Sequence, residues 1–474
     1  MCYAGEQFWQ GWHAFSSEHS KEHSISAGVV SITEMKVVLI CGGIGKRMVP
    51  ITKDKTLLKF NGKPLVLHQI TAATEAGLDQ FVIVGSPGNL ADLKSTIAGV
   101  RAVNVDFAVQ QRPLGMADAL LSASALLDDE PFILVNSNDI FETSAYVQLI
   151  GEYQRNSNYS GYLTARQVED YFPGGYLVVN EHNEISHIVE KPPKGEEPSQ
   201  LINIVIHLHN EPRRLLDYLA KTSSTADDVY EKALGRMIDD GYGMKAVVYR
   251  GAWQAVKYPW HILNAMDYFL GQLTHRISPA AQISERAVID GDVIIEDNVK
   301  LLEGAVIRGP SYIGRSSVIG NGVLVRNAVI GNDCVVGYGT EIKHSYIGDG
   351  CWFHSNYVGD SVIEDDCSFG AGAVTANFRL DETDIKLQVS GDKVDTGLDK
   401  LGALVGKGCR IGINASLMPG IRVGADCFVG PHVCLTHDLE AGKMALAEPR
   451  YRVLPNETKP VGDKKQELLR RLTN

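Results

Sequence analysis

The chain has 474 residues, more than one ordinary core accommodates, and this length predicts roughly two to four domains. Its formal charge of −12 argues against nucleic acid or an anionic membrane as the main partner, because no long Lys/Arg block offsets the acidic surface. No stretch approaches the ~20 apolar residues of a membrane span, and no signal pattern opens the chain, so we expect a cytoplasmic protein. The cysteines show neither CxxC pairs nor histidine partners at zinc spacing, which favours buried free thiols over disulfides or metal ligands.

Residues 1–34 are polar and rich in Ser, His and Glu, without a recognisable period. We predict a disordered extension, because so few apolar side chains do not offset the entropy of ordering. Its histidines, His13, His19 and His23, are more typical of a solvated tail than of a metal site.

Between residues 35 and 275, short apolar runs alternate with helical patterns, which predicts a doubly wound, Rossmann-like α/β domain. The expected strands are 36–40, 81–85, 104–109, 132–136, 161–165, 176–179, 186–189, 202–208 and 245–249. The expected helices are 66–77, 115–127, 143–156, 211–221, 226–240 and 260–274.

The first strand is followed by the glycine-rich stretch CGGIGKRM, residues 41–48. Glycines allow a backbone to approach a phosphate chain, where a Cβ would intrude. Two cations, Arg47 and Lys55, lie within reach of the charge that such a loop holds. A glycine motif of this kind, taken alone, is equally compatible with an ordinary turn.

A carboxylate follows a second buried strand, FILVN, at Asp139. Ligands of open α/β sheets lie beyond the carboxyl ends of the strands, where the glycine loop also lies. Since Mg²⁺ usually bridges one or two carboxylates and substrate phosphates, Asp139 is a candidate metal ligand. The alternative is a turn or helix-capping aspartate.

From about Ile277 a six-residue period appears, as in IDGDVI, IGNGVL and IGDGCW. A hexapeptide period predicts a parallel β-helix, here over 276–445, in which aliphatic side chains stack inside and glycines permit tight corners. A polar insertion, 379–401, must leave the coil as a loop, and the tail 446–474 contains a short charged helix, KKQELLRRL. The small interior position is occupied by Cys334, Cys351, Cys367, Cys409 and Cys427.

The motifs occur in an order that resembles the bifunctional N-acetylglucosamine-1-phosphate uridylyltransferase/glucosamine-1-phosphate acetyltransferases of the archaeal type. CGGIGKRMVPITKDKTLLKFNGKP is similar to that family's glycine-loop signature, except that Asp54 stands where proline is common. QQRPLGMADAL, VNSNDIF and IVEKP are similar to its base-binding, metal-binding and sugar-binding motifs. The resemblance implies a left-handed β-helix, Mg²⁺, acetyl-CoA as co-substrate, and a homotrimer packed through the β-helix.

The resemblance also implies roles in nucleotidyl transfer for individual residues. Arg47 and Lys55 would stabilise charge on the transferred phosphoryl group, Gly43 and Gly45 would face the triphosphate, and Asp139 would hold the metal. Gln110 and Gly115 would bind the base. The sugar phosphate would be bound by Gly175, Glu190, Lys191 and Asn203.

For acetyl transfer, HSNYVGD is similar to the family's HxxYxGD motif, which places His354 at the catalytic histidine. A base of near-neutral pKa suits the removal of an ammonium proton. Lys343 and Tyr357 match sugar-phosphate positions, and Arg326 is a further phosphate candidate. Acetyl-CoA contacts are implied for Asn377, Ala403 and Lys407, the last two meeting His354 only across a subunit interface.

One motif departs from the family, because GAWQAVKYPWHIL carries Ala255 where a second metal-binding carboxylate is usual and Lys257 where glycine is usual. Either Asp139 and substrate phosphates hold Mg²⁺ with Lys257 supplying charge, or this domain binds nucleotide and turns over poorly. The expected substrates are UTP and N-acetylglucosamine-1-phosphate, with acetylation of an amino-sugar-1-phosphate. Alternatives are dTTP or GTP with glucose- or mannose-1-phosphate, and a non-catalytic regulatory protein of the same two-domain plan.

Overall fold

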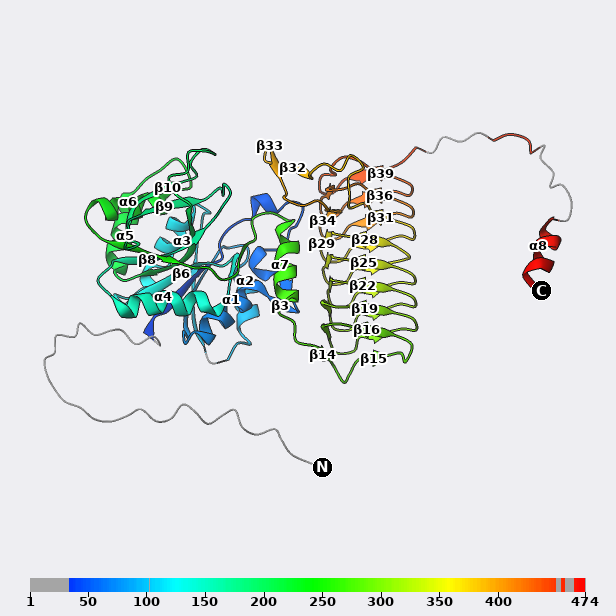
Figure 1. The fold of residues 1–474 in the computed structure, drawn as a ribbon, viewed down its shortest axis with the longest axis horizontal. Helices are drawn as coiled ribbons and strands as arrows, with labels where there is room; N and C mark the ends of the chain where they lie inside the picture. Colours follow the sequence, from blue (N-terminus) through cyan, green and yellow to red (C-terminus); the bar gives the residue numbers. More distant parts are fainter. Residues whose placement is uncertain (1–33, 102, 449–452, 457–463, 474) are drawn as a thin grey trace, which may run out of the picture.

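A computed structural model describes residues 34–448 except 102, together with 453–456 and 464–473. The predicted extension, apart from residue 34, and much of the predicted tail lie outside these residues. An α/β domain and a column of stacked coils lie side by side in Figure 1. The predicted C-terminal helix is present as α8 (Lys464–Thr473). No helix in the described parts of the chain is long and apolar enough to cross a bilayer.

The first domain contains a nine-stranded sheet with the central order β10-β9-β11-β6-β1-β4-β5; β8 pairs with β11 and β12. Its strands are β1 (Lys36–Ile40), β4 (Gln80–Gly85), β5 (Asn104–Val109), β6 (Phe132–Asn136), β8 (Gly161–Gln167), β9 (Gly175–Val179), β10 (Ile185–Glu190), β11 (Leu201–His209) and β12 (Met244–Val248). The central strand β1 runs parallel to both β4 and β6, and its core residues Val37, Val38 and Leu39 are fully buried. The predicted strands are therefore confirmed, with ends that differ by a few residues.

Helices form where the sequence predicts them, although most are shorter than expected. They are α1 (Leu65–Glu75), α3 (Met116–Ser122), α4 (Thr143–Arg155), α5 (Pro212–Lys221), α6 (Val229–Asp239) and α7 (His261–Leu270). One helix, α2 (Leu90–Ile97), was not predicted, because only Leu93 and Ile97 of its residues are buried and they form too short an apolar stripe. Two short antiparallel strands, β7 (Asp139–Phe141) and β13 (Trp253–Ala255), were also not predicted.

The second domain is a parallel β-helix with three long sheets, one on each face. The first sheet consists of β14 (Arg276–Ile277), β17 (Val293–Ile295), β20 (Ser311–Ile313), β23 (Val329–Ile330), β26 (Tyr346–Ile347), β29 (Val362–Ile363), β34 (Leu404–Val405) and β37 (Arg422–Val423). The second consists of β15 (Gln282–Ile283), β18 (Lys300–Leu301), β21 (Val318–Ile319), β24 (Val335–Val336), β27 (Trp352–Phe353), β30 (Ser368–Phe369), β35 (Arg410–Ile411), β38 (Phe428–Val429) and β40 (Met444–Ala445). The third consists of β16 (Val288–Asp290), β19 (Val306–Arg308), β22 (Leu324–Arg326), β25 (Glu341–Lys343), β28 (Tyr357–Gly359), β31 (Val374–Thr375), β36 (Ser416–Leu417) and β39 (Cys434–Leu435).

The interior of the coil is a single apolar column, because side chains at the same position of successive coils stack on each other. Val336 pairs with Phe353 and Phe353 with Phe369 along the second sheet. The five cysteines predicted at interior positions are buried and free, as is Cys41, which confirms that prediction. Cys434 is exposed, and Cys2 lies outside the described residues.

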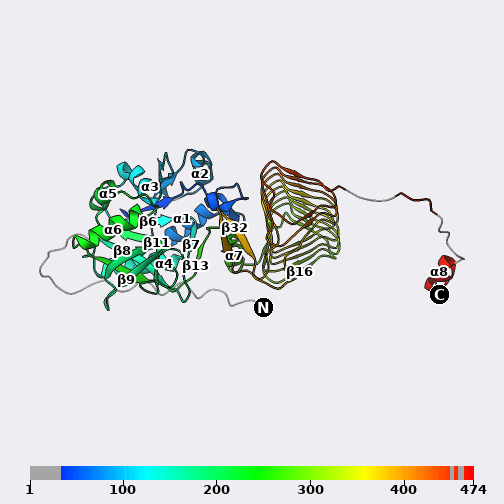
Figure 2. The same ribbon diagram turned by 90° about the horizontal axis from the view of Figure 1, so that it is seen from above.

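The insertion 379–401 leaves the coil as expected, but the prediction of a plain loop is wrong. Its centre forms an antiparallel hairpin of β32 (Lys386–Val389) and β33 (Asp392–Asp395). Ile385, Leu387 and Val389 are buried, and β32 lies between the two domains in Figure 2. Their spacing of two residues is the strand period, which the surrounding charges obscure.

The two domains share an apolar interface, formed by the first sheet of the β-helix and by α7 with the hairpin β2 (Lys59–Phe60) and β3 (Lys63–Pro64). The Phe60 ring lies 5.0 Å from that of Phe269 and 5.8 Å from that of Tyr346, measured between centroids. Because burial of such rings stabilises by ~1.5–3 kcal/mol each, the domains are held in a fixed relative position.

A histidine bridges the domains at the edge of this interface. His344 Nε2 lies 3.0 Å from each carboxylate oxygen of Asp267 on α7, and Nδ1 lies 2.8 Å from Asp360 Oδ1. Hydrogen bonds to Asp267 and Asp360 outweigh partial burial and raise the pKa of His344 to about 9. The imidazolium therefore stabilises the folded chain below the unfolded pKa of about 6.5, and this contribution is lost as pH rises through about 9.

We expect His344→Gln to lower the free energy of unfolding at pH 6 by about 1–2 kcal/mol, a figure reduced for partial solvent exposure. The part that depends on charge should disappear above pH 9. Urea unfolding of both proteins between pH 6 and 10 measures this difference, and the exposed His182→Gln serves as a control. Parallel stability curves for wild type and His344→Gln would contradict the assignment.

Candidate active sites

The glycine loop begins inside the sheet and then turns away from it. The Cys41 amide donates to the Val84 carbonyl at 2.8 Å, and Gly45 has a φ of 59°, which favours glycine. A Cβ on Gly43 would meet nothing within 4 Å, so this part of the backbone faces open space. A Cβ on Gly42 would come within 2.5 Å of Gln110 Oε1, so Gln110 packs directly on the loop. The resemblance did not single out Gly42.

The two residues predicted to bind the base lie together. Gln110 Nε2 donates to the Gly115 carbonyl at 2.9 Å and to Asp118 Oδ2 at 3.0 Å. Gly115 has a φ of 89°, and Asp227 Oδ1 occupies the position that its Cβ would take. Glycine is therefore required at 115 for its conformation and for the approach of α6.

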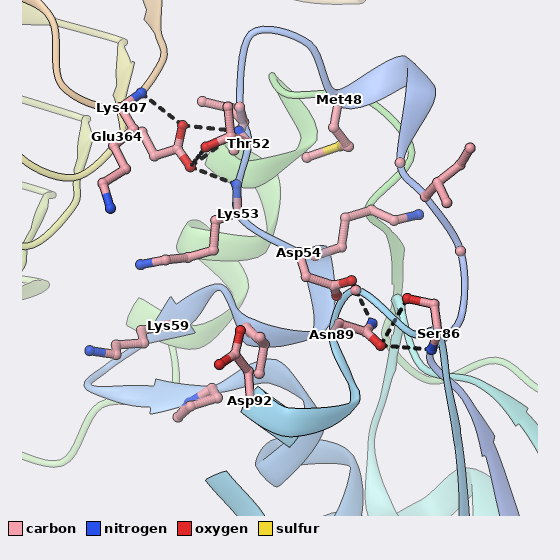
Figure 3. A pocket seen from close by; sticks show the side chains of 18 of the residues that line it. Met48, Thr52, Lys53, Asp54, Lys59, Ser86, Asn89, Asp92, Glu364 and Lys407 are labelled. Atoms are coloured by element: carbon pink, nitrogen blue, oxygen red, sulfur yellow. Dashed lines mark hydrogen bonds between the residues drawn. The ribbon is translucent and has the colours of Figure 1, made fainter. Parts of the chain in front are cut away.

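Lys55 is set in place by a network behind the loop. Asp54 Oδ1 accepts from the Thr56 amide at 2.8 Å and caps the short helical turn Lys55–Leu57. Asn89 Nδ2 donates to Asp54 Oδ2 (Figure 3) and to the Cys41 carbonyl, both at 2.7 Å. Asp54 thus joins the loop to the lysine. Burial lowers the pKa of Lys55, although the charges of Asp139 and Asp54 act to raise it.

Asp139 lies opposite Ala255 across the β7–β13 pair. Its Oδ1 is buried without a hydrogen-bond partner among the described residues, which suits a cation ligand. Burial raises the pKa of Asp139 to about 6, although the charges of Lys257 and Lys55 act to lower it. No three His, Cys, Asp or Glu side chains in the described ranges gather closely enough to hold a metal by themselves. The residues therefore fit Mg²⁺ only as one carboxylate that is completed by substrate phosphates.

Two further cations face this carboxylate region. Lys257 Nζ lies 4.1 Å from the centroid of the Phe172 ring, and burial lowers the pKa of Lys257 against the charge of Asp139. Arg47 is exposed, with its guanidinium carbon 5.7 Å from the centroid of the Tyr258 ring. Lys55, Lys257 and Arg47 thus gather near Asp139, whose charge acts on both lysines.

The residues predicted to bind the sugar phosphate also converge. Gly175 pairs with Glu190 in the β9–β10 register, and a Cβ at 175 would lie 2.9 Å from Glu190 Oε2 and 3.5 Å from Asn203 Cβ. Lys191 Nζ forms an ion pair with Glu190 at 2.6 Å. Beside them, Glu231 has its pKa raised to about 7 by burial and by the charges of Glu190 and Asp227.

A buried relay behind Asn203 was not predicted from the sequence. Asn203 Oδ1 lies 2.6 Å from His207 Nε2, and Tyr230 Oη lies 2.7 Å from both His207 Nδ1 and His209 Nε2. Burial lowers the pKa of both histidines, so they are neutral. Because the amide oxygen only accepts, His207 donates from Nε2, Tyr230 donates to His207, and His209 donates to Tyr230. The relay fixes the orientation of the Asn203 amide, so that its oxygen is bonded to His207 and its NH₂ group can donate to a ligand.

Under the sugar-phosphate role that the resemblance implies for Asn203, Tyr230→Phe should raise the KM for sugar-1-phosphate by about tenfold with a smaller effect on kcat. The reason is that it leaves two buried ring nitrogens unpaired and releases the Asn203 amide. Initial-rate kinetics over both substrates measure this split. Tyr218→Phe, which removes a hydroxyl that bonds Asp240 at the surface, is the control. A KM equal to that of wild type would refute the positioning role of the relay.

In the β-helix, three predicted residues gather around Asp360. Lys343 Nζ donates to Asp360 Oδ2 at 2.8 Å, Asn377 Nδ2 donates to the same oxygen, and Asn377 Nδ2 also lies 3.3 Å from Tyr357 Oη. Burial raises the pKa of Asp360, but hydrogen bonds from His344, Lys343 and Asn377 outweigh it and hold the pKa below its usual value. Asp360 thus organises the cluster.

Outward cations form a column beside this cluster. Arg308 pairs with Arg326 and Arg326 with Lys343 in the register of the third sheet. Arg326 donates twice to Glu341, at 3.0 and 2.6 Å. Arg308 was not predicted as a phosphate contact. It is the last residue of its strand, as Arg326 is of the next, and this shared position could have shown that the two side chains align.

His354 is exposed at the corner between the second and third sheets, where its amide donates to Asn356 Oδ1 at 2.5 Å. Lys407 is exposed at the corner between the first and second sheets, beside the α/β domain. Ala403 is fully buried, and its amide and carbonyl bond to Ser361 Oγ and the Val362 amide. The structure therefore does not present Ala403 to a ligand.

The α/β domain with its glycine loop and the β-helix with its hexapeptide repeats together define a nucleotidyl transferase joined to a hexapeptide-repeat transferase. The Nucleotidyl transferase family matches residues 36–266, and the Bacterial transferase hexapeptide (six repeats) family matches 292–327 and 402–437. A bifunctional protein GlmU from Methanococcus maripaludis is 30% identical over 425 residues, covering 86% of this chain and 96% of its own length.

Two further relatives extend this likeness. A bifunctional protein GlmU from Methanococcus vannielii is 31% identical, covering 86% of this chain and 96% of its own length. A bifunctional sugar-1-phosphate nucleotidylyltransferase/acetyltransferase from Sulfurisphaera tokodaii is 30% identical, covering 86% of this chain and 99% of its own length. The chain belongs to the family of bifunctional nucleotidylyltransferase/acetyltransferases.

Proposed function

We propose that the α/β domain transfers a uridylyl group from UTP to N-acetylglucosamine-1-phosphate and releases pyrophosphate. The observation that supports this most directly is the convergence of the glycine loop, Lys55 and Asp139 at the carboxyl ends of β1 and β6. Arg47 and Lys55 stabilise the charge that develops on the transferred phosphoryl group. The sugar phosphate is held by Gly175, Glu190, Lys191 and Asn203.

The proposed metal is Mg²⁺, bound by Asp139 Oδ1 and substrate phosphates. When bound, it supplies positive charge to the phosphate oxygens. Lys257 takes over part of this role, since its ammonium faces the same pocket as Asp139 and no second carboxylate is present at Ala255. This favours an active domain over one that only binds nucleotide.

The β-helix acetylates glucosamine-1-phosphate with acetyl-CoA. His354 removes a proton from the substrate ammonium, and the freed amine attacks the thioester carbonyl and releases the CoA thiol. Arg308, Arg326 and Lys343 form the cationic wall that faces the phosphate. Tyr357 orients the amino sugar, and Asn377 contacts acetyl-CoA.

We propose a homotrimer, because Lys407 and His354 lie at different corners of the β-helix and a neighbouring chain brings a second corner to His354. Trp352 and Phe428 on the second sheet are 50% and 41% exposed, which suits a face that a neighbouring chain covers. In this assembly the acetyl-CoA contacts of Asn377 and Lys407 come from different chains.

Two assays of the purified chain test this function. UTP, Mg²⁺ and N-acetylglucosamine-1-phosphate should release pyrophosphate, and glucosamine-1-phosphate with acetyl-CoA should release free thiol. Turnover confined to dTTP or GTP with glucose- or mannose-1-phosphate would assign these substrates to the α/β domain in place of UTP and N-acetylglucosamine-1-phosphate. Silence with every sugar and nucleotide, together with retained nucleotide binding and a co-purifying protein, would favour the non-catalytic alternative.

A further inference from the structure

A carboxylate of the β-helix binds the segment of the α/β domain that leads to Lys55. Glu364 follows β29, is 3% exposed, and accepts hydrogen bonds from the Thr52 amide at 3.0 Å, the Thr52 hydroxyl at 2.8 Å and the Lys53 amide at 2.6 Å (Figure 3). It also accepts from the Lys407 amide at 2.9 Å. The hydrogen bonds from Thr52 and Lys53 hold the two domains together strongly at this point, because a hydrogen bond to a charged acceptor is stronger than one between neutral groups.

The segment that Glu364 holds, residues 49–53, has other contacts with the coil. A Cβ on Gly406 would lie 2.7 Å from the Pro50 carbonyl, so the backbone of the segment lies against the coil. Lys53 Nζ forms an ion pair with Asp365 at 2.5 Å. Met48 and Ile51 are buried in the apolar core that the two domains share.

This segment connects the two parts of the nucleotide site. It follows the glycine loop and precedes Asp54, whose cap and bond to Asn89 fix Lys55. A cavity of ≈ 670 Å³ between the domains is lined by Gly43, Gly45 and Lys55 on one wall and by Glu364 and Lys407 on the other (Figure 3). The segment is thus placed by the second domain, although its ends belong to the site of the first.

We propose that Glu364 is a positioning residue for nucleotidyl transfer, acting from the acetyltransferase domain by holding residues 52 and 53 so that Lys55 faces Asp139. The inference rests on the proposed role of the glycine loop and Lys55. It makes the nucleotide site incomplete without the β-helix. A displacement of about 1 Å at a charge-stabilising group lowers a rate by up to about 100-fold.

The matched variants are Glu364→Gln, which turns one acceptor oxygen into a donor, and Asp365→Asn, which alters the neighbouring ion pair. Glu364→Gln should lower kcat for nucleotidyl transfer by about 10- to 100-fold and leave the KM for sugar-1-phosphate within about twofold, since Asn203 and Glu190 do not touch the segment. Asp365→Asn should stay within about threefold of wild type. Thr52→Val, which removes only the hydroxyl donor, should give an intermediate loss.

Three results would overturn the inference: wild-type kcat in Glu364→Gln, an equal loss in Asp365→Asn, or a raised KM for sugar-1-phosphate with unchanged kcat. UTP binding by calorimetry separates failure of this inference from failure of the proposed function. If wild type binds UTP without turnover, the proposed function fails, and the positioning role still predicts at least roughly tenfold weaker binding by Glu364→Gln. Equal UTP affinity in that case would refute it.

Discussion

His354→Ala should abolish thiol release from acetyl-CoA, lowering the rate by about 10²- to 10⁴-fold, and should leave pyrophosphate release unchanged. The imidazole is the base in the proposed acetyl transfer, and it lies at the corner between the second and third sheets, whereas the α/β domain packs on the first sheet. Steady-state assays of both activities on one preparation measure the effect.

His432→Asn is the matched control, because His432 is an exposed histidine at the same edge of the β-helix on a later coil, and asparagine tolerates its positive φ of 59°. It should retain both activities. Loss of both activities in His354→Ala, or full acetyl transfer by that variant, would refute the division of labour between the domains.

Lys257→Ala should lower kcat for nucleotidyl transfer by about 10²- to 10³-fold, with acetyl transfer unchanged. The reason is that the proposal gives Lys257 the role of supplying charge, in a pocket where the resemblance implies a second carboxylate and this chain has Ala255. Rates at saturating UTP and sugar phosphate, over a range of Mg²⁺ concentrations, measure the loss. Lys94→Ala, which removes an exposed ammonium on α2, is the control.

The double variant Ala255→Asp, Lys257→Gly places the family's usual residues in the pocket. It should recover nucleotidyl transfer relative to Lys257→Ala and reach half its maximal rate at lower Mg²⁺ than wild type, because two carboxylates bind the cation more tightly. Wild-type kcat in Lys257→Ala would show that the lysine only packs against Phe172.

The sequence predicts most of the fold, because both domains repeat a simple pattern. Strands buried on both faces, such as β1 and β6, appear as continuous apolar runs, and the hexapeptide period identifies the coil. The misses are elements whose partners are distant in sequence. The hairpin β32–β33 is stabilised by burial of Leu387 and Val389 against the other domain, and β7 pairs with β13 more than a hundred residues later.

The candidate site shows the same division. Lys55, Asp139 and His354 could be predicted, because each lies in a short motif of neighbouring residues. Glu364 resembles any other acid at a coil corner until its contacts with Thr52 are seen. The relay from Asn203 to Tyr230 joins β11 to α6, and its histidines appear in the sequence only as members of a buried strand.

The most direct test of the whole account is the mass of the nucleotide sugar that the chain forms from one mixture. Wild-type protein is supplied with glucosamine-1-phosphate, acetyl-CoA, Mg²⁺ and equal amounts of UTP, dTTP and GTP. The account predicts UDP-N-acetylglucosamine, which requires both sites, and its absence when His354→Ala replaces wild type. A chain that forms no nucleotide sugar from this mixture, or forms UDP-N-acetylglucosamine equally well with His354→Ala, would contradict it.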